Sequence, residues 1–463
     1  MKPVPLYLLP LCLALAACAQ VDAPADRTVA TPASWQFAQS TQPQNDARQW
    51  WRQFASPTLE RLIEQAQAGN HDLAAATARI RQAQAVATVA GAALLPEVTW
   101  GANVGREHLL RGDGYGQLNA YGDHRIYNTY DGALSASYEV DFWGGNRAAR
   151  ASALKGVEAS QYDRAVVQLS VLGGVAEAYL KAMALDEQVR IAALNLKNAQ
   201  RVQALVRSRA DAGSASALEL AQQNGLVAAQ QRQVPLLRQQ ADEAMLSLAT
   251  LLGRPIQGLT LGSEAFAQLT WPSLGAGVPS ELLRRRPDIA AAEAKLAAAE
   301  ADVQVARAAM LPKLNLTASF GTGAEHLSET LRNPFYRLAA GLVGPVFDHG
   351  RLDAKREQAR AKREELLEDY RGSIVQAFAD VEKALVGIRY LDQQRQWQEE
   401  ELQQAQRAFD LAQNRYQAGA EDLLTVLETQ RTLYAAQDLQ VQLRLSRLTA
   451  SVGLYKALGG TWQ

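Results

Sequence analysis

One cysteine near the amino terminus has the clearest chemistry in this sequence. Lys2 precedes an apolar run over residues 4–14, and a Leu-Ala-Ala-Cys motif follows that ends at Cys18. This layout is typical of a bacterial secretory signal with a lipobox, in which the cysteine thiol receives a diacylglycerol before the signal is removed. The sequence therefore predicts a lipoprotein whose mature chain begins at Cys18. Ordinary signal cleavage around residues 14–16 is the alternative.

The rest of the chain offers few residues for catalysis or metal binding. Cys18 is the only cysteine of the mature chain, since Cys12 lies inside the signal, so no internal disulfide is expected. The sequence contains no glycine-rich phosphate loop. We therefore expect no enzyme, no bound metal and no cofactor beyond the covalent lipid on Cys18. The five histidines show no metal-ligand spacing and are His71, His108, His124, His326 and His349.

Composition and charge favour a helix-rich protein that does not bind nucleic acid. The 463 residues carry a formal net charge of -1, and aromatic residues make up 7%. Alanine and glutamine, which favour helices, are abundant. Residues 18–45 are rich in Ala, Pro, Thr and Asp, which predicts an extended tether. Aspartate directly after the lipid-bearing cysteine retains lipoproteins at the inner membrane of enteric-type bacteria, so Ala19 is compatible with the outer membrane.

The sequence repeats itself in two registers. An aspartate, an aliphatic residue and three alanines begin at Asp72 and again at Asp288, 216 residues later. An Arg-x-x-Ala-Gly run ends at Gly213 and again at Gly419, 206 residues later. These registers predict a duplication, with a first repeat over residues 46–275 and a second over residues 276–463. The shorter second offset means that the first repeat has the longer outer loop.

Each repeat predicts a helix, a β-hairpin and two long helices. The first helix ends at Pro96 or Pro312, because proline disfavours helix in the residue before it. Apolar residues then alternate with small or polar ones, which predicts hairpins over about residues 96–143 and 312–347, with strands of about 9 to 11 residues. The hairpin loops fall at 106–131 and 322–333. Long helices follow over about 146–252 and 350–458, and their proline-free parts reach roughly 100 Å each.

The four predicted strands impose a constraint on assembly. Strands cross lipid only as a closed barrel, in which every backbone group is paired. Four strands cannot close, so the chain must share a barrel with copies of itself, eight strands from two copies or twelve from three. A small soluble sheet packed on helices is the alternative for the alternating pattern. Aromatic residues that could form interfacial girdles are Trp100, Phe142, Trp143, Phe335, Tyr336 and Phe347.

Three short motifs resemble a known family. Residues 282–289 read Leu-Leu-Arg-Arg-Arg-Pro-Asp-Ile, residues 138–144 read Tyr-Glu-Val-Asp-Phe-Trp-Gly, and residues 344–348 read Gly-Pro-Val-Phe-Asp. With them the mature chain resembles the outer-membrane factors of tripartite efflux and type I secretion systems, TolC-like in fold and closest to the OprM and NodT lipoprotein branch.

This resemblance implies a mainly α protein with a small β part. It implies a homotrimer with a 12-stranded outer-membrane β-barrel, four strands per protomer, continuous with a long periplasmic α-helical barrel. It also implies a periplasmic adaptor protein, an inner-membrane pump of the RND type and outer-membrane lipid as partners. The duct itself is expected to be passive, carrying small molecules such as drugs outward. The alternative from another class is a periplasmic coiled-coil structural lipoprotein without a barrel.

The resemblance further implies a gate at the periplasmic tip, over residues 209–222 and 415–430. By position, the acidic rings of the family fall on Thr425 and Glu428. Thr425 replaces an aspartate, so one ring at Glu428 is expected. Tyr416 matches a gate tyrosine that would bond Glu219. Glu428→Ala, alone or with Tyr416→Phe, is therefore expected to raise conductance in planar bilayers. The predicted gate residues are Glu219, Tyr416, Thr425, Glu428 and the turn glycines Gly213 and Gly419.

Overall fold

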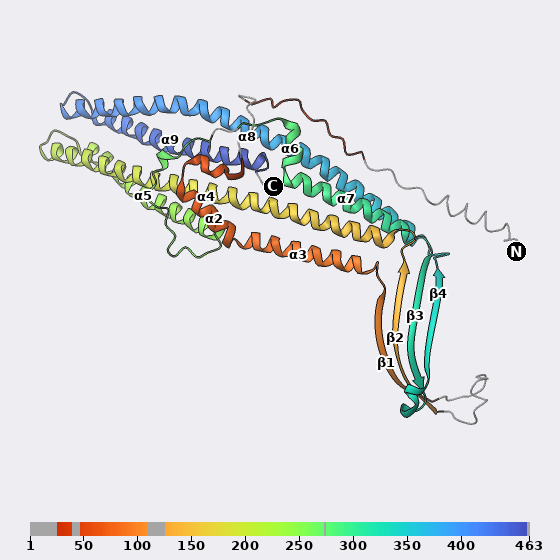
Figure 1. The fold of residues 1–463 in the computed structure, drawn as a ribbon. Helices are drawn as coiled ribbons and strands as arrows, with labels where there is room; N and C mark the ends of the chain where they lie inside the picture. The colour runs from red at the N-terminus through yellow and green to blue at the C-terminus, as the bar shows by residue number, and fades with distance from the viewer. Residues whose placement is uncertain (1–25, 39–46, 109–125, 273–274, 461–463) are drawn as a thin grey trace.

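The computed structural model describes residues 26–38, 47–108, 126–272 and 275–460, and Cys18 lies outside these ranges. Two long helices dominate the structure and extend away from a single sheet (Figure 1). They are α4 (Gly145–Asp211) and α8 (Arg351–Gln417), each an unbroken 67 residues. Each turns back into a helix of 35 residues, α5 (Ala217–Leu251) or α9 (Leu423–Ala457). The predicted long helices are confirmed.

The two repeats share one plan, element by element. The helix before each hairpin has 22 residues in both repeats, α3 (His71–Ala92) and α7 (Pro287–Ala308). Each repeat closes where its last helix meets the start of this helix. Asn70 Nδ2 donates to the Leu251 carbonyl at 2.8 Å, and Arg286 Nη1 donates to the equivalent Ala457 carbonyl at 3.2 Å. The predicted duplication therefore extends to single hydrogen bonds.

Glycine is required at both of these joints. Gly253 and Gly459 have φ angles of +67° and +89°. A Cβ on Gly253 would lie 2.1 Å from the carbonyl oxygen of Gly69, and one on Gly459 would lie 2.7 Å from that of Arg285. Both the left-handed backbone and the close approach exclude a side chain. The sequence has Leu252-Gly253 and, 206 residues later, Leu458-Gly459, and the glycine of each pair allows its repeat to close.

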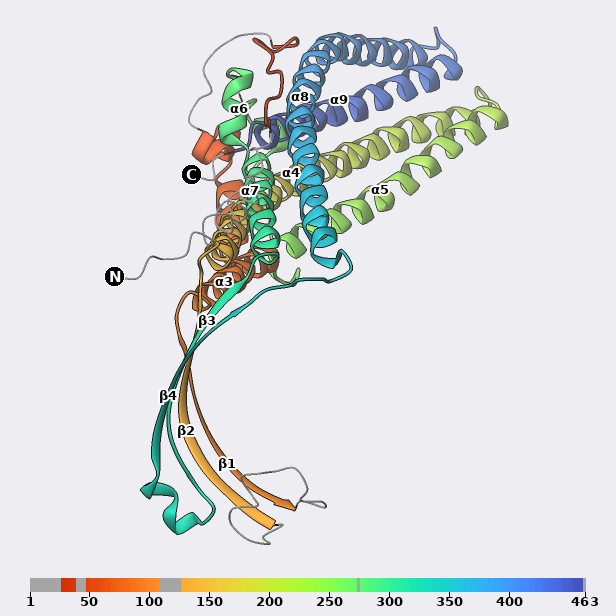
Figure 2. The same cartoon turned by 90° about the vertical axis from the view of Figure 1, so that its right-hand side faces the viewer.

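Four antiparallel strands form one sheet in the order β1-β2-β3-β4, and they leave the helices as a curved layer (Figure 2). They are β1 (Glu97–His108), β2 (Ile126–Val140), β3 (Lys313–Ala324) and β4 (Pro334–Val343). They have 12, 15, 12 and 10 residues, so three of them are longer than predicted. The extra residues come from the predicted loops, and the short helix η3 (Leu327–Arg332) occupies the second one. Of the first loop, residues 109–125 lie outside the described ranges.

The strand register separates an apolar face from a polar face. Directly paired residues lie on the same face of a sheet, and neighbours along a strand lie on opposite faces. All even-numbered strand residues therefore share one face, which includes Val98, Trp100, Val104, Leu134, Ala136, Val140, Leu314, Leu316, Ala318, Phe320, Leu338 and Leu342. The odd-numbered face includes Glu97, Thr99, Asn103, Asp131, Ser135, Ser137, Glu139, Lys313, Asn315, Thr317, Ser319 and Arg337.

Polar groups on the odd face bond to one another. Asn103 Nδ2 donates to Asp131 at 2.9 Å, and Lys313 Nζ lies 3.0 Å from a Glu139 carboxylate oxygen. Phe335 also lies on this face, since it pairs with Gly321 in the register. Its prediction as part of a lipid-facing girdle was wrong, because the neighbouring Tyr336 occupies the apolar face. A sheet with one polar and one apolar face is typical of the wall of a transmembrane β-barrel.

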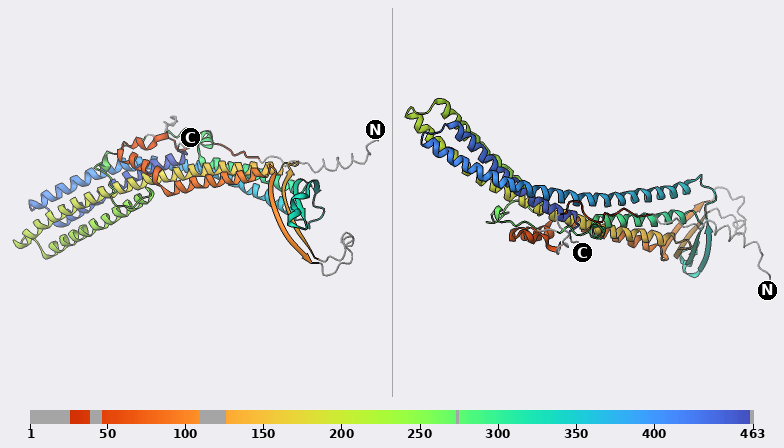
Figure 3. Two further views of the ribbon diagram at one scale, coloured as in Figure 1. Left: turned by 60° about the horizontal axis from the view of Figure 1, so that its bottom comes forward. Right: turned by 90° about the horizontal axis from the view of Figure 1, so that it is seen from above.

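Short segments cover one side of the helices at mid-length (Figure 3). They are η1 (Ala47–Phe54), α2 (Pro57–Gly69), η2 (Phe266–Gln268) and α6 (Pro279–Arg285). The Trp50 ring packs 4.9 Å from that of Tyr455 of α9. Glu264 accepts hydrogen bonds from Ser56 and from Tyr179 of α4, at 2.5 and 3.0 Å. These contacts border the main hydrophobic core, which is built around the middle of α4 and the C-terminal half of α9.

Among the described residues, α4 alone is long and apolar enough to pass a simple test for a membrane-spanning helix. Half of the apolar window that passes is buried inside the protein. Val171 and Val175 of this helix belong to the main core, and Val167 packs against it. The apolar residues of α4 in this core are therefore explained by its contacts with η1, α2, η2 and α9.

Candidate functional site

Two turns between helices form the tip, and the first of them joins α4 to α5. Gly213 takes a φ of +75° directly after the helix, where an L-residue with a side chain would be strained. The Ser214 N–H then donates to the Arg209 carbonyl at 2.8 Å. Ser216 begins α5 with a capping box, because its hydroxyl accepts from the Glu219 N–H and the Glu219 carboxylate accepts from the Ser216 N–H. Glu219 is thus bonded within its own turn.

The second turn joins α8 to α9 and differs in its side chains. Gly419 has a φ of +77°, and the Ala420 N–H donates to the Arg415 carbonyl at 2.8 Å. Arg415 Nε lies 3.1 Å from a Glu421 carboxylate oxygen, so this arginine braces its own turn. A carboxylate caps α9, since the Thr425 N–H donates to Asp422 Oδ1 at 2.9 Å. Both predicted turn glycines therefore occupy left-handed positions.

Arg209 ties the first turn to the second. Its Nη1 donates to the Tyr416 carbonyl at 2.9 Å, and its guanidinium carbon lies 4.6 Å from the centroid of the Tyr416 ring. Tyr416 is 2% exposed and belongs to a core that also contains Val206 of α4 and Leu427 of α9. A cation over an aromatic face and a charged donor on a carbonyl both stabilise a contact between helix ends. This cross-repeat link was not predicted from the sequence.

The predicted bond between Tyr416 and Glu219 is not formed. The buried Tyr416 hydroxyl has no hydrogen-bond partner in the described part of the chain. Glu219 accepts from both the backbone and the hydroxyl of Ser216 instead, and a local cap costs less conformational freedom than a bond across helices. Burial raises the pKa of Tyr416 above its usual value, which the Arg209 charge opposes and the Glu219 charge reinforces. Tyr416 contributes its ring and its carbonyl to the tip rather than its hydroxyl.

Thr425 and Glu428 lie on successive turns at the start of α9. Thr425 donates its N–H and its hydroxyl to Asp422, so its side chain belongs to the helix cap. It is the repeat-equivalent of Glu219, 206 residues earlier, which also belongs to a cap. Glu428 is exposed one turn further on, and its equivalent in the first repeat is Gln222. Only the second repeat presents an exposed carboxylate at this position.

Two leucines at the tip are a feature that the gate prediction missed. Leu218 is 67% exposed at the start of α5, and its repeat-equivalent Leu424 is 53% exposed at the start of α9. The helix caps hold both of them next to the turns, away from the core. Their spacing of 206 residues was a detectable signal, since the duplication places an exposed apolar residue at the same point twice.

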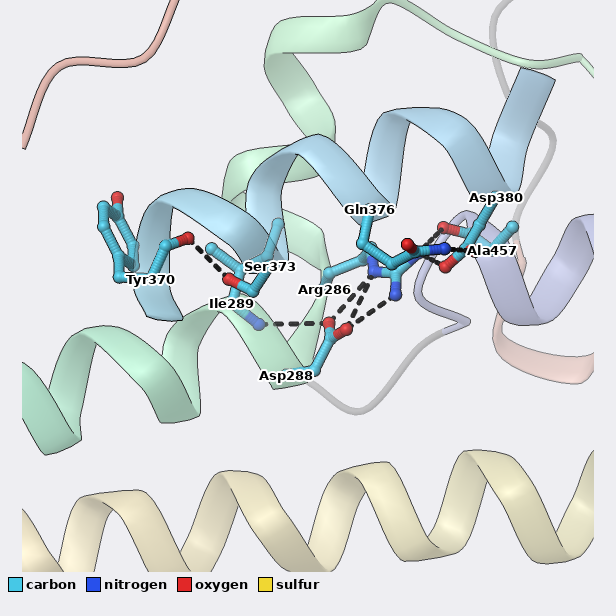
Figure 4. A network of polar contacts seen from close by, with 8 residues as sticks. All are labelled: Arg286, Asp288, Ile289, Tyr370, Ser373, Gln376, Asp380 and Ala457. Carbon is cyan, nitrogen blue, oxygen red and sulfur yellow. Dashed lines mark hydrogen bonds and ion pairs between the residues drawn. The ribbon is translucent and has the colours of Figure 1, made fainter. Parts of the chain in front are cut away.

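The Arg-Pro-Asp motif of the second repeat lies far from the tip, at the joint between α7 and α9 (Figure 4). The Arg286 side chain is 11% exposed and lies between Asp288 at 2.6 Å and Asp380 of α8 at 3.0 Å. It also bonds the last carbonyl of α9, at Ala457. A buried arginine held by two carboxylates fixes the orientation of three helix segments. The motif therefore has a structural role, since it holds α7, α8 and α9 together.

Aspartates cap both long helices at the sheet end. Asp141 accepts from the Asn146 and Arg147 N–H groups, and Asp348 accepts from the Leu352 N–H at 2.9 Å. Gly144 and Gly350 precede the helices with φ angles of +76° and +79°. Between strand and helix the chain exposes apolar side chains in both repeats, namely Phe142, Trp143, Val346 and Phe347. Such exposed aromatic residues beside an apolar sheet face are typical of a membrane interface.

Fold and site together define a class of protein. A curved sheet with one apolar face, continued by two helices of 67 residues that each turn back into a helix of 35 residues, is the protomer of an outer-membrane channel with a periplasmic helical extension. Among the residues that the structure describes, no cluster of three or more metal-ligating side chains is found.

Comparison with known proteins identifies the family. The model of the family described as "Outer membrane efflux protein" matches residues 62–254 and 278–460, so the chain belongs to this family of transport proteins. A pyoverdine export outer membrane protein, OpmQ of Pseudomonas aeruginosa, is 57% identical over 99% of this chain and 97% of its own length. The protein of the same name from Pseudomonas putida is 57% identical over 100% of this chain and 98% of its own.

Solved structures agree with this assignment. The outer-membrane channel OprN superposes with a TM-score of 0.87 at 29% identity, covering 96% of this chain and 99% of that one. The open state of the Neisseria gonorrhoeae MtrE outer membrane channel gives a TM-score of 0.85 at 27% identity, covering 95% and 98%. The chain is thus the outer-membrane duct component of an export system, with the TolC-like fold that its sequence predicts.

Proposed function

We propose that this chain is the duct through which a siderophore of the pyoverdine class leaves the cell. The identity of 57% to pyoverdine export proteins, over nearly the whole of each chain, carries the proposal. A toluene efflux pump outer membrane protein, TtgF of Pseudomonas putida, is only 31% identical and aligns with 89% of this chain. The difference favours siderophore export over solvent or drug efflux as the main task.

The working form in this proposal is a homotrimer. Strands β1 and β4 are the two edges of the sheet, and among the described residues each is hydrogen-bonded on one side only. An open edge is not tolerated in lipid, so β1 of one copy would pair with β4 of the next. Three copies give twelve strands, with the apolar face toward lipid and the polar face toward a water-filled bore. The lipid on Cys18 would anchor each protomer to the same membrane.

The partners in this proposal are a periplasmic adaptor and an inner-membrane pump of the RND type. Leu218 and Leu424 offer the adaptor exposed apolar contacts at the tip, at the end of the duct furthest from the sheet (Figure 1). The Arg209 link to Tyr416 holds the two turns together in the closed state. Glu428 would contribute one carboxylate per protomer to an acidic ring at the entrance. The pump supplies the energy, and the duct conducts passively.

Complementation tests the cargo. A Pseudomonas aeruginosa strain without OpmQ would express this chain, and pyoverdine would be measured in the medium and in the periplasm. We expect export to be restored, with TtgF and an empty vector as controls that leave pyoverdine inside. Pyoverdine retained in the periplasm, despite correctly inserted protein, would contradict the proposed cargo. Equal restoration by TtgF would show that the duct does not select the cargo.

A further inference from the structure

A cavity of about 590 Å³ lies over the joint of the second repeat, between α4 and α8. Its floor is the end of α9 and the start of α7, where Arg286 Nη1 bonds the Ala457 carbonyl (Figure 4). Helix α4 contributes Val166 and Leu169 to one wall, and α8 contributes Lys383 to the other. Sites for small organic molecules have volumes of about 300 to 1,000 Å³, so the cavity is large enough for one.

The cavity lies on the side of the helices that the short segments do not cover. On α9, Leu448, Val452 and Tyr455 belong to the main core, which η1 and α2 cover. A helix turns by about 100° per residue, so Ala450 and Gly453, which line the cavity, lie on the opposite side of α9. In the proposed trimer the covering segments lie outside the ring of helices, since they would obstruct the bore from within. The cavity would therefore open into the bore.

Two glycines leave this cavity open. Gly387 and Gly453 lie inside α8 and α9, and a Cβ at either position would meet nothing within 4 Å. Glycine destabilises a helix interior relative to alanine, and no neighbouring atom of the described residues requires its small size here. Both positions therefore keep free a space that a larger side chain would fill.

The carboxylates of the floor are already engaged. Arg286 lies between Asp288 at 2.6 Å and Asp380 at 3.0 Å. The other carboxylate oxygen of Asp380, Oδ1, accepts a hydrogen bond from Gln376 Nε2 at 2.8 Å. The arginine and its two carboxylates thus balance one another, and they form a fixed floor rather than a site for further charge.

Two lysines supply the positive charge of the cavity. Lys383 is exposed one turn along α8 from Asp380, and it forms no ion pair among the residues that the structure describes. Lys456 Nζ lies 3.4 Å from Glu177 Oε1, a loose contact in which both side chains are 37% exposed. A cation without a partner beside apolar side chains is suited to an anion with an apolar body.

The joint of the first repeat does not have these lysines. Lys383 corresponds to Glu177 and Lys456 corresponds to Thr250, each 206 residues earlier. The duplicated plan of helices therefore forms a joint without the two cations, and their presence in the second repeat needs another reason.

We propose that this cavity binds an organic anion with a flat apolar body, whose charged oxygens lie against Lys383 and Lys456 and whose body fills the space above Gly387 and Gly453. This inference deepens the proposed function and rests on it for the nature of the cargo. Iron(III) is a hard metal ion that is bound through anionic oxygen atoms, so a siderophore presents the chemistry that this site would recognise. The site would concentrate such cargo at mid-length of the duct.

Binding of salicylate tests the site, because this flat aromatic carboxylate is small enough for the cavity. The purified full-length lipoprotein would be titrated by calorimetry in matched detergent buffer, with salicylamide as the neutral analogue. We expect salicylate to bind, and salicylamide to bind at least about tenfold more weakly. Lys383→Gln should raise the dissociation constant for salicylate about tenfold, and Lys383→Arg should stay within about threefold of the wild type.

Matched variants outside the cavity provide the controls. Lys355→Gln makes the same change at another exposed lysine of α8 and should leave binding unchanged. Gly453→Leu fills the cavity and should abolish binding, whereas Gly225→Leu, on α5 with open space around the added carbon, should not. Equal binding of salicylate by the wild type and by Lys383→Gln, or of salicylate and salicylamide by the wild type, would overturn the site.

The outcome for the site is separate from the outcome for the cargo. Salicylate binding by a protein that does not restore pyoverdine export would overturn the proposed cargo and support the site. Export restored by a protein that does not bind salicylate would overturn the site alone.

A cysteine in the cavity gives a reading that does not depend on affinity for salicylate. In Gly453→Cys, an anionic methanethiosulfonate reagent should react about fivefold faster, relative to a cationic one, than in Gly225→Cys. Adding Lys383→Gln to Gly453→Cys should remove this preference. An equal preference at the two positions would overturn the inference.

Discussion

The two turns at the tip have the same backbone and different side chains. Each follows a helix of 67 residues and precedes a helix of 35 residues, and their glycines have φ angles of +75° and +77°. Arg209 reaches across to the other turn, whereas its equivalent Arg415 braces its own. The first turn has Ala210 and Gln222 where the second has Tyr416 and Glu428. The two turns therefore share a backbone conformation that comes from the duplication. Their side chains differ, so that Arg209 of the first turn donates a hydrogen bond to the Tyr416 carbonyl of the second.

The largest effect is expected from removing that link. Arg209→Ala deletes a charged hydrogen bond and a cation over an aromatic ring, and the partial solvent exposure of Arg209 limits the loss to about 1.4 kcal/mol, or about tenfold in the opening of the tip. Single-channel recordings in planar bilayers should show a higher open fraction. Arg415→Ala is the matched control, since its contacts lie within one turn, and it should change the open fraction by less than about twofold. Equal effects would show that the two arginines are equivalent after all.

Substitution of either turn glycine by alanine should have the same effect, because the two turns share one backbone conformation. Gly213→Ala or Gly419→Ala places a Cβ at positive φ at a cost of about 1 kcal/mol, so local opening rises about fivefold. Hydrogen exchange over residues 209–216 and 415–422 measures this opening. Gly156→Ala, inside α4 with open space around the added carbon, should be neutral or stabilising. A difference between the two turns of more than about fivefold would contradict their backbone equivalence.

Substitution of Glu428 tests the difference between the second turn and the first, in which Gln222 is the equivalent residue. Glu428→Ala removes one carboxylate per protomer from the proposed entrance of the duct, and we expect conductance to rise about twofold and preference for cations to fall. Gln222→Ala, the matched change in the first repeat, should leave ion selectivity unchanged. Unaltered conductance and selectivity in Glu428→Ala would remove this residue from the gate. Since the Tyr416 hydroxyl has no hydrogen-bond partner among the residues that the structure describes, adding Tyr416→Phe should change nothing further.

The smallest expected effect is the loss of the Asp422 cap of α9 at low pH. The Thr425 N–H and, second, its hydroxyl hold the pKa of Asp422 below its ordinary value of 3.8. The charged cap therefore stabilises α9 above that value and loses its effect as pH falls through the lowered pKa. Protection of the first turn of α9 from hydrogen exchange, corrected for intrinsic rates, should decline below about pH 4. Asp422→Ser, which copies the Ser216 cap, should remove this dependence. An unchanged decline in that variant would assign it to another group.

Much of this molecule follows from local sequence patterns. The alternating apolar residues predict four strands, and the proline-free runs predict two helices that the structure shows to be continuous. The two offsets predict the duplication, because a repeated pattern of neighbours folds into a repeated element. Glycine at 213 and 419 predicts the turns, since few other residues adopt a positive φ without strain. These features depend on residues a few positions apart.

Contacts between distant residues were decided by the tertiary structure. The bond expected between Tyr416 and Glu219 is absent because Ser216 satisfies the carboxylate three residues away. The link between Arg209 and Tyr416 depends on how the first repeat packs against the second, through α4 with α7 and α9, which periodicity does not specify. Phe335 faces the polar side of the sheet because the pairing of β3 with β4 sets its register. Local patterns determine which elements form, and packing determines which side chains meet.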